Sequence, residues 1–354
     1  MTKNYSRKPR PMNLEDIAAK AGVSRSTVSR VINNEMYVSK KTREKVLAVI
    51  DAEGFSPNPA ARMLVTNRTH IIGVVIPNIP SVVFADAEYF PTLLQGIAEV
   101  TQQRDYAMLL WLGQAGEEER RFYQRVLNNR LMDGLIVASA SIGSPFIEHL
   151  AHSDIPFVLV ERPEYYVDKI SYVTTDNVRA AEQAVDHLIN QGYRYIAIIT
   201  GDLSITDGVD RYEGYRNALR KADIPFDELL VVEGHFKKRS GYLGVNILLE
   251  RGVKFDAIFA GSDMTAIGAY EALQEANIKI PDDVAVIGYD DLPSATQIKP
   301  QLTTIRQPIH EKGAKATSIL VDLIENRHSG PQQILLPTQL VIRESTGALS
   351  RRTV

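Results

Sequence analysis

The first hydrophobic pattern in the chain has the period of an α-helix. Its apolar positions recur at i, i+3, i+4 and i+7, so they line one face of a short helix. These positions are Leu14, Ile17, Ala18 and Ala21. Asn13 is the expected N-cap, because its side chain can accept a hydrogen bond from the first turn, and Gly22 is expected to end the helix.

A second helix is predicted directly after this glycine. Val23 is the expected buried spacer of the turn and Ser24 the expected N-cap, while Val28, Val31 and Ile32 form the inward face. The outward face carries Arg25, Ser26, Ser29 and Arg30. Two short helices around a tight glycine turn, the second with small polar and basic side chains, are typical of a helix-turn-helix that reads DNA. The other interpretation is a helical hairpin with ordinary caps and a solvated basic face.

The outward side chains divide into two groups by their chemistry. An arginine can bridge both acceptors of a guanine, so Arg25, Ser26 and Arg30 are candidates for reading base edges. Hydroxyl and amide groups suit phosphate contacts, which fix the register on DNA without reading its sequence. The candidates for such contacts are Ser24, Thr27 and Asn33.

A third helix and a linker follow. The helix is predicted from Ser39 to about Glu53, buried through Val46, Val49 and Ile50 and ended by Gly54. The next stretch contains two prolines and a helix-compatible run at 60–64, which is too short to be stable without a partner or DNA.

Leu64 closes this run among basic residues. An apolar side chain in such a setting can wedge between base steps of the minor groove, or it can pack on the rest of the protein. The residues themselves leave both interpretations open.

After His70 the pattern changes to short apolar runs separated by amphipathic segments. Most runs lack the alternation of a half-exposed strand, which predicts parallel strands buried between helices in two doubly wound α/β lobes. The runs are 71–77, 106–112, 134–138, 157–161, 195–201, 257–261 and 284–291. Ligands bind beyond the carboxyl ends of such strands, so the polar residues after each run are pocket candidates. They are Asn78, Glu161, Arg162, Asp176, Asp202, Ser262, Asp263, Tyr289 and Asp290.

Composition narrows the class of protein. The 354 residues are 44% hydrophobic and 23% charged, as in ordinary globular proteins, and the length suggests two or three domains. Cysteine is absent, which excludes disulfides, thiolate metal sites and cysteine nucleophiles. No apolar run reaches the roughly 18 residues that span a bilayer, and no hydrophobic segment typical of a signal peptide follows the polar N-terminus. We therefore expect a cytoplasmic protein.

The charge is divided unevenly along the chain. Residues 1–70 hold 13 basic and 6 acidic side chains, a net +7, whereas the whole chain carries −3, so residues 71–354 carry −10. This division predicts a polyanion-binding head on an acidic body and favours the DNA-reading interpretation. A basic arm at 1–12, with Lys3, Arg7, Lys8 and Arg10, either touches the DNA backbone or is a solvated terminus.

The sequence offers little for catalysis. It has no Walker-type glycine loop, no G-x-S-x-G elbow and no GxGxxG after a strand, so neither an enzyme nor a cofactor is expected. His149 and His152 lack further metal ligands nearby, and the acid pairs at 282–283 and 290–291 do not by themselves imply a metal. A plain sugar-binding protein would need a signal peptide and has no use for residues 1–66.

At this point the chain resembles the lactose/galactose repressor (LacI/GalR) family of bacterial transcription regulators over essentially its whole length. The motifs are DIAAKAGVSRSTVSRVIN at 16–33, VSKKTREKV at 38–46, PNPAARML at 57–64, GSDMTAIGA at 261–269, VIGYDD at 286–291, LTTIRQP at 302–308 and RESTG at 343–347. The resemblance implies an all-α helix-turn-helix head at 13–57, a hinge helix at 58–68 and an α/β core similar to periplasmic sugar-binding proteins.

In this family the core chain crosses three times between two lobes, with the ligand in the cleft between them. The resemblance therefore implies lobe one at 69–172 and 303–335, and lobe two at 173–302 and 336–354. Two protomers pair so that their heads read a pseudo-palindromic operator, and hinge leucines enter the central minor groove, where Leu64 matches. No heptad-patterned tail follows RESTG, so we expect a homodimer rather than a tetramer.

The resemblance also assigns site residues. The DNA contacts it implies, together with those argued above, are Asn13, Leu14, Ser24, Arg25, Ser26, Thr27, Arg30, Asn33, Asn58, Arg62 and Leu64. Arg25 and Ser26 fall on a pair that varies in the family, so no operator sequence is implied.

For the effector, Arg211 matches an arginine that donates a forked pair of hydrogen bonds, and Asp290 matches an aspartate that accepts from ligand hydroxyls. Glu161 matches a carboxylate of the first lobe and Phe236 an aromatic side chain that covers a ring face. Two acceptors, a guanidinium and an aromatic plane suit a polyhydroxylated ring, which favours a sugar. The further candidates are Asn78, Phe84, Arg162, Ser262, Asp263 and Gln307. Ser262 replaces an asparagine that is common in the family.

The expected function is that of a repressor of carbohydrate-utilisation genes, which a sugar releases from its operator. Such an effector acts only through different affinities for two arrangements of the lobes. The alternative is a regulator that uses a purine, another metabolite or a phosphoprotein as co-repressor.

Overall fold

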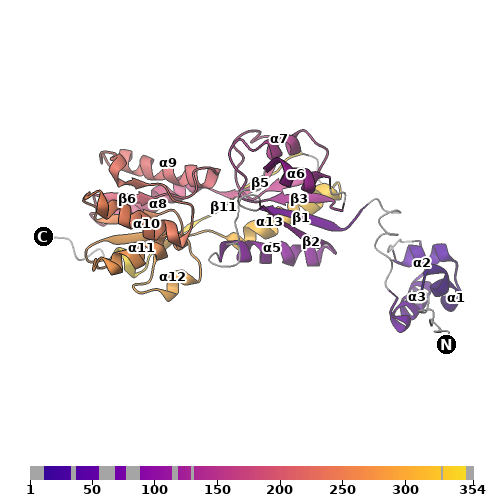
Figure 1. The fold of residues 1–354 in the computed structure, drawn as a ribbon. Coiled ribbons are helices and arrows are strands. Elements are labelled where there is room, and N and C mark those ends of the chain that lie inside the picture. Colours follow the sequence, from indigo (N-terminus) through magenta and orange to yellow (C-terminus); the bar gives the residue numbers. More distant parts are fainter. Residues whose placement is uncertain are drawn as a thin grey trace, which may run out of the picture. The chain divides into compact units, whose positions relative to one another are not determined.

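The computed structural model describes residues 12–32, 37–55, 68–76, 88–113, 119–128, 131–327 and 330–347. The chain divides into two compact units, Met1–Thr69 and His70–Val354, which we call the head and the body (Figure 1). Some of the predicted site residues lie outside the described residues. They are Asn33, Asn58, Arg62, Leu64, Asn78 and Phe84.

The head contains helices α1 (Leu14–Ala21), α2 (Arg25–Ile32) and α3 (Lys40–Glu53). Asn13 begins α1 with a capping box, because its Oδ1 accepts from Asp16 N at 3.0 Å while Asp16 Oδ2 accepts from Asn13 N at 2.9 Å. Gly22 ends α1 at φ 60°. Ser24 caps α2, its Oγ accepting from Thr27 N at 3.1 Å. These boundaries confirm the predicted helices.

The core of the head is small. Its buried residues are Ile17, Ala18, Ala21, Val28, Val31 and Val46. Partly buried side chains from all three helices surround them, including Leu14, Val49 and Ile50. Because so few side chains are buried, each one contributes a large share of the head's stability.

In the body, the first sheet has the order β11-β5-β4-β3-β1-β2, and all its strands are parallel. The strands are β1 (Ile71–Ile76), β2 (Ala107–Leu112), β3 (Gly134–Val137), β4 (Phe157–Leu159), β5 (Ser171–Thr175) and β11 (Gln333–Leu336). Helices α5 (Tyr89–Gln103) and α13 (Ile309–Ile324) pack on one face, and α6 (Glu119–Leu127) and α7 (Pro145–Ala151) pack on the other. This is lobe one.

The second sheet has the order β12-β10-β9-β8-β6-β7, in which only β12 is antiparallel to its neighbour. The strands are β6 (Ile196–Ile199), β7 (Val231–Val232), β8 (Ala257–Ala260), β9 (Ala285–Asp290), β10 (Thr303–Arg306) and β12 (Gln339–Val341). Helices α8 (Asn177–Asn190) and α9 (Thr206–Lys221) cover one face, and α10 (Lys238–Glu250) and α11 (Asp263–Glu275) cover the other. The short elements α12 (Ser294–Gln297), η1 (Glu228–Leu230) and η2 (Glu344–Thr346) complete lobe two.

The chain crosses between the lobes three times, and each of the three boundaries differs from the predicted one. Residues 173–175 belong to lobe one, because β5 pairs with β11 as far as Thr175. Residues 303–306 belong to lobe two, because β10 pairs with β9 along its whole length. Leu336 still belongs to β11, so the last crossing follows it. None of the helices in the described part of the chain is both long and apolar enough to cross a membrane.

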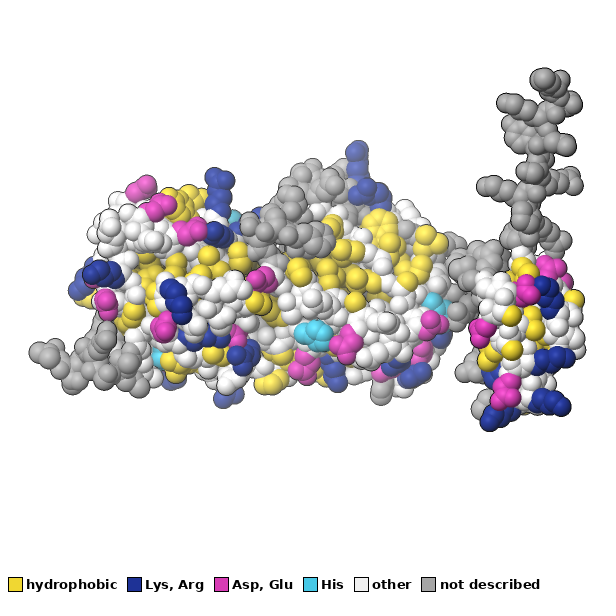
Figure 2. Space-filling view, turned by 90° about the horizontal axis from the view of Figure 1, so that it is seen from below, with side chains coloured by type: hydrophobic (Ala, Val, Ile, Leu, Met, Phe, Trp, Pro, Cys, Tyr) yellow, Lys and Arg dark blue, Asp and Glu magenta, His cyan; other side chains and the backbone are white. Residues whose placement is uncertain are grey.

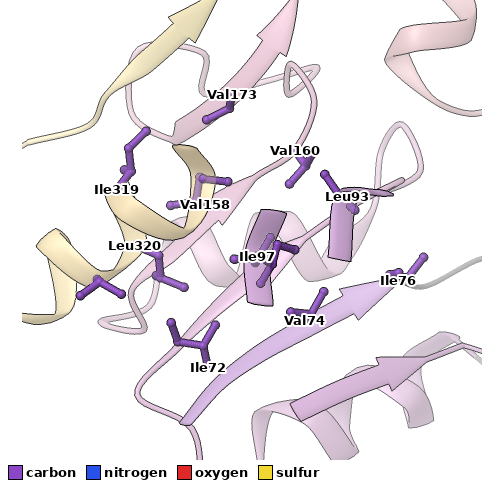
Figure 3. Close-up of a cluster of buried hydrophobic side chains, with 14 of the residues drawn as sticks. Ile72, Val74, Ile76, Leu93, Ile97, Val158, Val160, Val173, Ile319 and Leu320 are labelled. Atoms are coloured by element: carbon purple, nitrogen blue, oxygen red, sulfur yellow. The ribbon is translucent and has the colours of Figure 1, made fainter. Parts of the chain in front are cut away.

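Helices α5 and α13 approach each other closely in lobe one. A Cβ atom on Gly96 would clash with the backbone of His310, and one on Gly313 would clash with the backbone of Leu93, so glycine is required at both positions. Figure 3 shows the adjoining core, where Ile319 and Leu320 of α13 lie near strand residues such as Val158. This packing fixes the register of α13 and hence the place of its first turn near the strand ends.

Candidate functional site

Helix α2 presents the predicted base-reading side chains to solvent. Arg25, Ser26 and Arg30 are exposed, and Figure 2 shows basic side chains over the visible face of the head among several acidic ones. Arg25 Nε lies 3.3 Å from Glu15 Oε1, and both side chains are largely exposed. Such a surface ion pair contributes little, so Arg25 can exchange it for DNA.

Asn13 and Leu14 both have roles inside the head. The side-chain oxygen of Asn13 is used in the capping box of α1, and Leu14 packs against the head core. They therefore position α1, while their contact with DNA stays a prediction. Ser24 Oγ lies 2.7 Å from Ser26 Oγ and 2.8 Å from Thr27 Oγ1, which gathers three hydroxyl groups at the start of α2.

In the body, buried charged side chains gather where strands of both sheets end. Glu161 follows β4 and Lys312 lies in the first turn of α13, both in lobe one. Asp207 and Arg211 lie on α9, and Asp290 is the last residue of β9, all in lobe two. Each of the five is 6% exposed or less. These residues define the cleft cluster, which combines side chains from both lobes.

Arg211 is held in one orientation by lobe two. Its Nε donates to Asn177 Oδ1 at 3.0 Å and its Nη1 donates to the carbonyl of Gly261 at 2.7 Å. The guanidinium lies 3.7 Å above the centre of the Tyr289 ring and 5.1 Å from that of Phe236. The structure therefore places Arg211 and Phe236, two of the predicted effector contacts, beside each other.

The carboxylates of lobe two lie beside this guanidinium. Asp207 Oδ2 and Asp290 Oδ1 are each 3.7 Å from a terminal nitrogen of Arg211, and Gln307 Nε2 donates to Asp290 Oδ1 at 2.6 Å. Burial raises the pKa of Asp290 to about 6, although Arg211 and the Gln307 hydrogen bond lower it. The carboxyl group of Asp290 is therefore mainly ionised, and acts as an acceptor with both oxygens, only above about pH 6.

Glu161 is the carboxylate of the opposite lobe. Its Oε1 accepts from Ala140 N at 2.8 Å. Burial, and then the charge of Asp207, raise its pKa to about 7, while backbone hydrogen bonds and Lys312 lower it. Although several carboxylates meet here, no group of three or more His, Asp or Glu side chains among the described residues is placed to hold a metal ion.

The raised pKa of Glu161 makes the stability of the ligand-free body depend on pH. Glu161 binds a proton more tightly in the folded protein, where its pKa is about 7, than in the unfolded chain, where it is about 4.5. Its contribution to the free energy of unfolding is therefore most favourable below pH 4.5 and declines as the pH rises through 7. The loss amounts to about 3 kcal/mol in the free energy of unfolding. Urea unfolding of the body transition at a series of pH values should show a flatter profile in Glu161→Gln than in the wild type.

The exposed Glu148 provides the matched control, and Glu148→Gln should leave the wild-type profile unchanged. Coincident profiles for the wild type and Glu161→Gln would contradict the raised pKa.

The turn that orients Asp290 has a strained backbone at two residues. Asp290 and Asp291 have φ angles of 126° and 59°, which L-residues rarely adopt. Asp291 Oδ2 accepts from Arg306 Nε at 2.6 Å, and its Oδ1 accepts from Arg343 Nη2 at 2.5 Å. The two arginines thus hold the turn that aims Asp290 into the cleft.

Asp263, another of the predicted effector contacts, uses its carboxylate within lobe two. It is fully buried, and its Oδ1 accepts from Thr304 Oγ1 at 2.5 Å while its Oδ2 accepts from Leu292 N at 2.7 Å. Both oxygens accept within lobe two, so the carboxylate supports the turn after β9, and its contact with an effector stays a prediction. Ser262 caps α11 and donates to the carbonyl of Phe236 at 3.3 Å, which ties that aromatic residue to the cleft.

Arg162 connects the two lobes. Its Nη2 and Nε donate to both oxygens of Asp210 on α9, at 2.8 and 3.2 Å, and its carbonyl accepts from Thr206 Oγ1 at 2.7 Å. Ile142 N also donates across the lobes, to the carbonyl of Ser204 at 2.7 Å. The guanidinium of Arg162 is therefore used between the lobes in this structure, and its contact with an effector stays a prediction.

Sequence reasoning missed several members of the cleft. Asp207 lies one helical turn before Arg211, and this i, i+4 spacing would have placed both on one face. Lys312 interrupts the buried face of α13, and this interruption of an apolar pattern was the signal that could have found it. Asp176 and Asp202, two of the polar residues after strands, cap local turns by accepting from Arg179 N and Ser204 N.

Comparisons with known proteins match both units. Residues 13–58 match the family model of bacterial regulatory proteins, lacI family, and residues 185–346 match that of a periplasmic binding protein-like domain. The HTH-type transcriptional regulator CelR of Thermobifida fusca is 37% identical over 340 residues, covering 96% of this chain and 99% of CelR.

Solved structures agree with these matches. A complex of the transcriptional regulator CelR with cellobiose superposes with a TM-score of 0.74 at 34% identity, covering 95% of this chain and all of that chain. The lac repressor dimer bound to operator and the anti-inducer ONPF gives a TM-score of 0.82 at 26% identity, covering 96% of this chain and all of that chain. The chain therefore belongs to the lacI family of bacterial regulatory proteins.

Proposed function

We propose that this protein is a sequence-specific repressor of carbohydrate-utilisation genes and that a sugar in the cleft between its lobes releases it from DNA. The observation that carries the proposal is the cleft cluster, in which the fixed guanidinium of Arg211 lies beside two carboxylates and the ring of Phe236, while Glu161 of the other lobe interacts electrostatically with Asp207. Carboxylates accept from sugar hydroxyls, the guanidinium donates to them, and an aromatic face covers the apolar side of a ring.

The arrangement of the cleft suggests how a ligand would act. Because the cluster draws side chains from both lobes, a ligand that contacts Glu161 and Asp290 together favours the lobe arrangement in which both are in reach. An effector shifts an equilibrium only by such a difference in affinity, and a few kcal/mol suffice.

On the DNA side, the protein acts as a homodimer on a pseudo-palindromic operator, in the cytoplasm and without catalysis. The head presents Arg25, Ser26 and Arg30 to base edges, and the hydroxyls at the start of α2 face phosphates. The structure of the lac repressor dimer on its operator supports this arrangement by analogy.

The test of the proposal is operator binding with and without ligand. A duplex selected in vitro by the full chain is titrated by fluorescence anisotropy in the presence of cellobiose, ribose or a purine base. We expect one of the sugars to weaken binding and to raise the melting temperature of the body. A purine that strengthens DNA binding, with no response to sugars, would overturn the sugar proposal in favour of a co-repressor.

Arg25→Ala should relax base preference. Removing a bidentate contact to guanine costs about 1–3 kcal/mol at that base pair, while phosphate contacts persist. In vitro selection from randomised duplexes should therefore return sites that are degenerate at one position in each half.

The matched control is Lys20→Ala, because Lys20 pairs with Glu53 inside the head at 2.6 Å. Lys20→Ala should change the affinities for selected and for random DNA by the same factor. If Arg25→Ala also weakened binding to selected and to random DNA by the same factor, Arg25 would be a phosphate contact and its assigned role would be wrong.

A further inference from the structure

Lys312 is the one charged residue on the buried face of α13. This face otherwise consists of small, apolar and hydroxyl-bearing residues such as Ile309, Ala316 and Leu320, which pack in lobe one. Lys312 is completely buried, and no other lysine among the described residues is buried. Packing does not require a cation at this position, and burial of a cation is costly. The buried ammonium of Lys312 therefore indicates a functional role.

The ammonium of Lys312 has donor capacity to spare. Its Nζ donates to Gln307 Oε1 at 2.8 Å and lies 3.4 Å from Tyr89 OH, which is a long contact. An ammonium carries three donors. Within the described residues no carboxylate lies at salt-bridge distance from it, although Glu161, Asp207 and Asp290 all act on it electrostatically.

Through Gln307, Lys312 connects lobe one with the acceptor of lobe two. Gln307 accepts from Lys312 with its oxygen and donates to Asp290 with its amide nitrogen, at 2.8 and 2.6 Å. The positive charge of Lys312 also lowers the pKa of both Glu161 and Asp290, against the effect of their burial. Lys312 therefore favours the ionised, accepting form of carboxylates on both sides of the cleft.

We infer that Lys312 determines ligand specificity, donating to a hydroxyl oxygen of an uncharged saccharide while it keeps Glu161 and Asp290 available as acceptors for neighbouring hydroxyls. This inference rests on the proposed function and deepens it by naming the class of ligand. The cleft holds three carboxylates against two cations, Arg211 and Lys312. A phosphorylated or acidic sugar would place a further negative charge beside the buried carboxylates of Asp207 and Asp290 and would make Glu161 harder to ionise, so the inference predicts that such ligands bind more weakly than neutral sugars.

The test compares Lys312→Met with Lys315→Met. Methionine keeps the length of the side chain without its charge, and Lys315 is an exposed lysine of the same helix. Titration calorimetry uses cellobiose, ribose and glucose 6-phosphate. Lys312→Met should weaken the neutral sugar that binds the wild type about tenfold or more, with a melting temperature of the body that is unchanged or higher. Lys315→Met should match the wild type, and glucose 6-phosphate should bind the wild type more weakly than the neutral sugar does.

A pH series provides a readout that a purely structural lysine would not move. The groups around Lys312 are Glu161, Asp207 and Asp290, with Arg211, Tyr89 and Gln307. Without the ammonium, the pKa of Glu161 and of Asp290 should rise, so the pH at which sugar affinity falls by half should move upward in Lys312→Met. Affinity within twofold of the wild type with an unmoved pH midpoint, or tighter binding of glucose 6-phosphate than of neutral sugars, would overturn the inference.

If no neutral sugar binds the wild type, the proposed function fails and the class of ligand inferred here fails with it. The electrostatic role of Lys312 is then judged separately on the ligand-free protein. The pH profile of urea unfolding should still shift to higher pH in Lys312→Met because Glu161 has lost a nearby cation. An unshifted profile would overturn that role as well.

Discussion

Arg211→Ala should abolish the response to sugar while the head still binds DNA. Arg211 is the fixed donor of the cleft, so its loss should weaken sugar binding about a hundredfold or more in titration calorimetry. It also leaves Asp207 and Asp290 buried beside an empty space, which should lower the free energy of unfolding of the body by about 3–5 kcal/mol. Operator binding should persist and no longer change when sugar is added.

Two further variants separate binding from stability in this experiment. Arg211→Lys keeps a positive charge near both aspartates but cannot donate a fork, so it should regain stability without regaining sugar affinity. Arg216→Ala removes an arginine that is 45% exposed on the same helix and should behave like the wild type. Sugar affinity in Arg211→Lys close to that of the wild type would show that the fork is not what binds the ligand.

Ile17→Ala should unfold the head and leave the body intact. Ile17 is fully buried within a core of six buried residues, and truncation of a buried isoleucine costs about 2–5 kcal/mol. A three-helix unit of this size has a net stability of the same order, so most molecules should lose the helix-turn-helix. Operator binding, measured by anisotropy, should then fall below detection, while calorimetry shows unchanged sugar binding by the body.

The control for this variant is Leu47→Ala on α3, since Leu47 is 42% exposed. It removes a similar apolar volume without opening a cavity and should retain operator binding. A folded Ile17→Ala head with normal operator affinity would mean that the core described here does not hold the head together.

Hydrophobic period predicted the elements whose sequences are strongly patterned. The head helices follow from apolar spacing and caps, and the predicted runs correspond to β1, β2, β3, β4, β6, β8 and β9. The strands left unpredicted have short or polar sequences, such as SYVTT in β5 and TTIR in β10. Their threonines fit a strand only through pairing with distant neighbours, which is why the lobe boundaries at β5 and β10 were misplaced.

Members of the cleft cluster were named from the sequence where the family resemblance identifies a residue, and were missed where only tertiary structure does. The family resemblance identifies Arg211 and Asp290, and the structure places Nη1 of Arg211 3.7 Å from Oδ1 of Asp290. Asp263 and Asp290 both follow a parallel strand, so the strand-end rule cannot distinguish them. Only the hydrogen bonds of Asp263 to Thr304 and Leu292 show that it faces inward. The interrupted apolar pattern of α13 marks Lys312 as buried, but nothing local indicates which groups a buried lysine faces.

The three crossings between the lobes affect how the protein is made on the ribosome. Lobe one needs α13 and β11, which are translated more than 130 residues after β5, so its core and the cation of the cleft are supplied late in synthesis. The head is encoded first and needs none of these later residues for its own core. A nascent chain can therefore acquire a folded DNA-reading head well before it acquires the cleft that is proposed to regulate it.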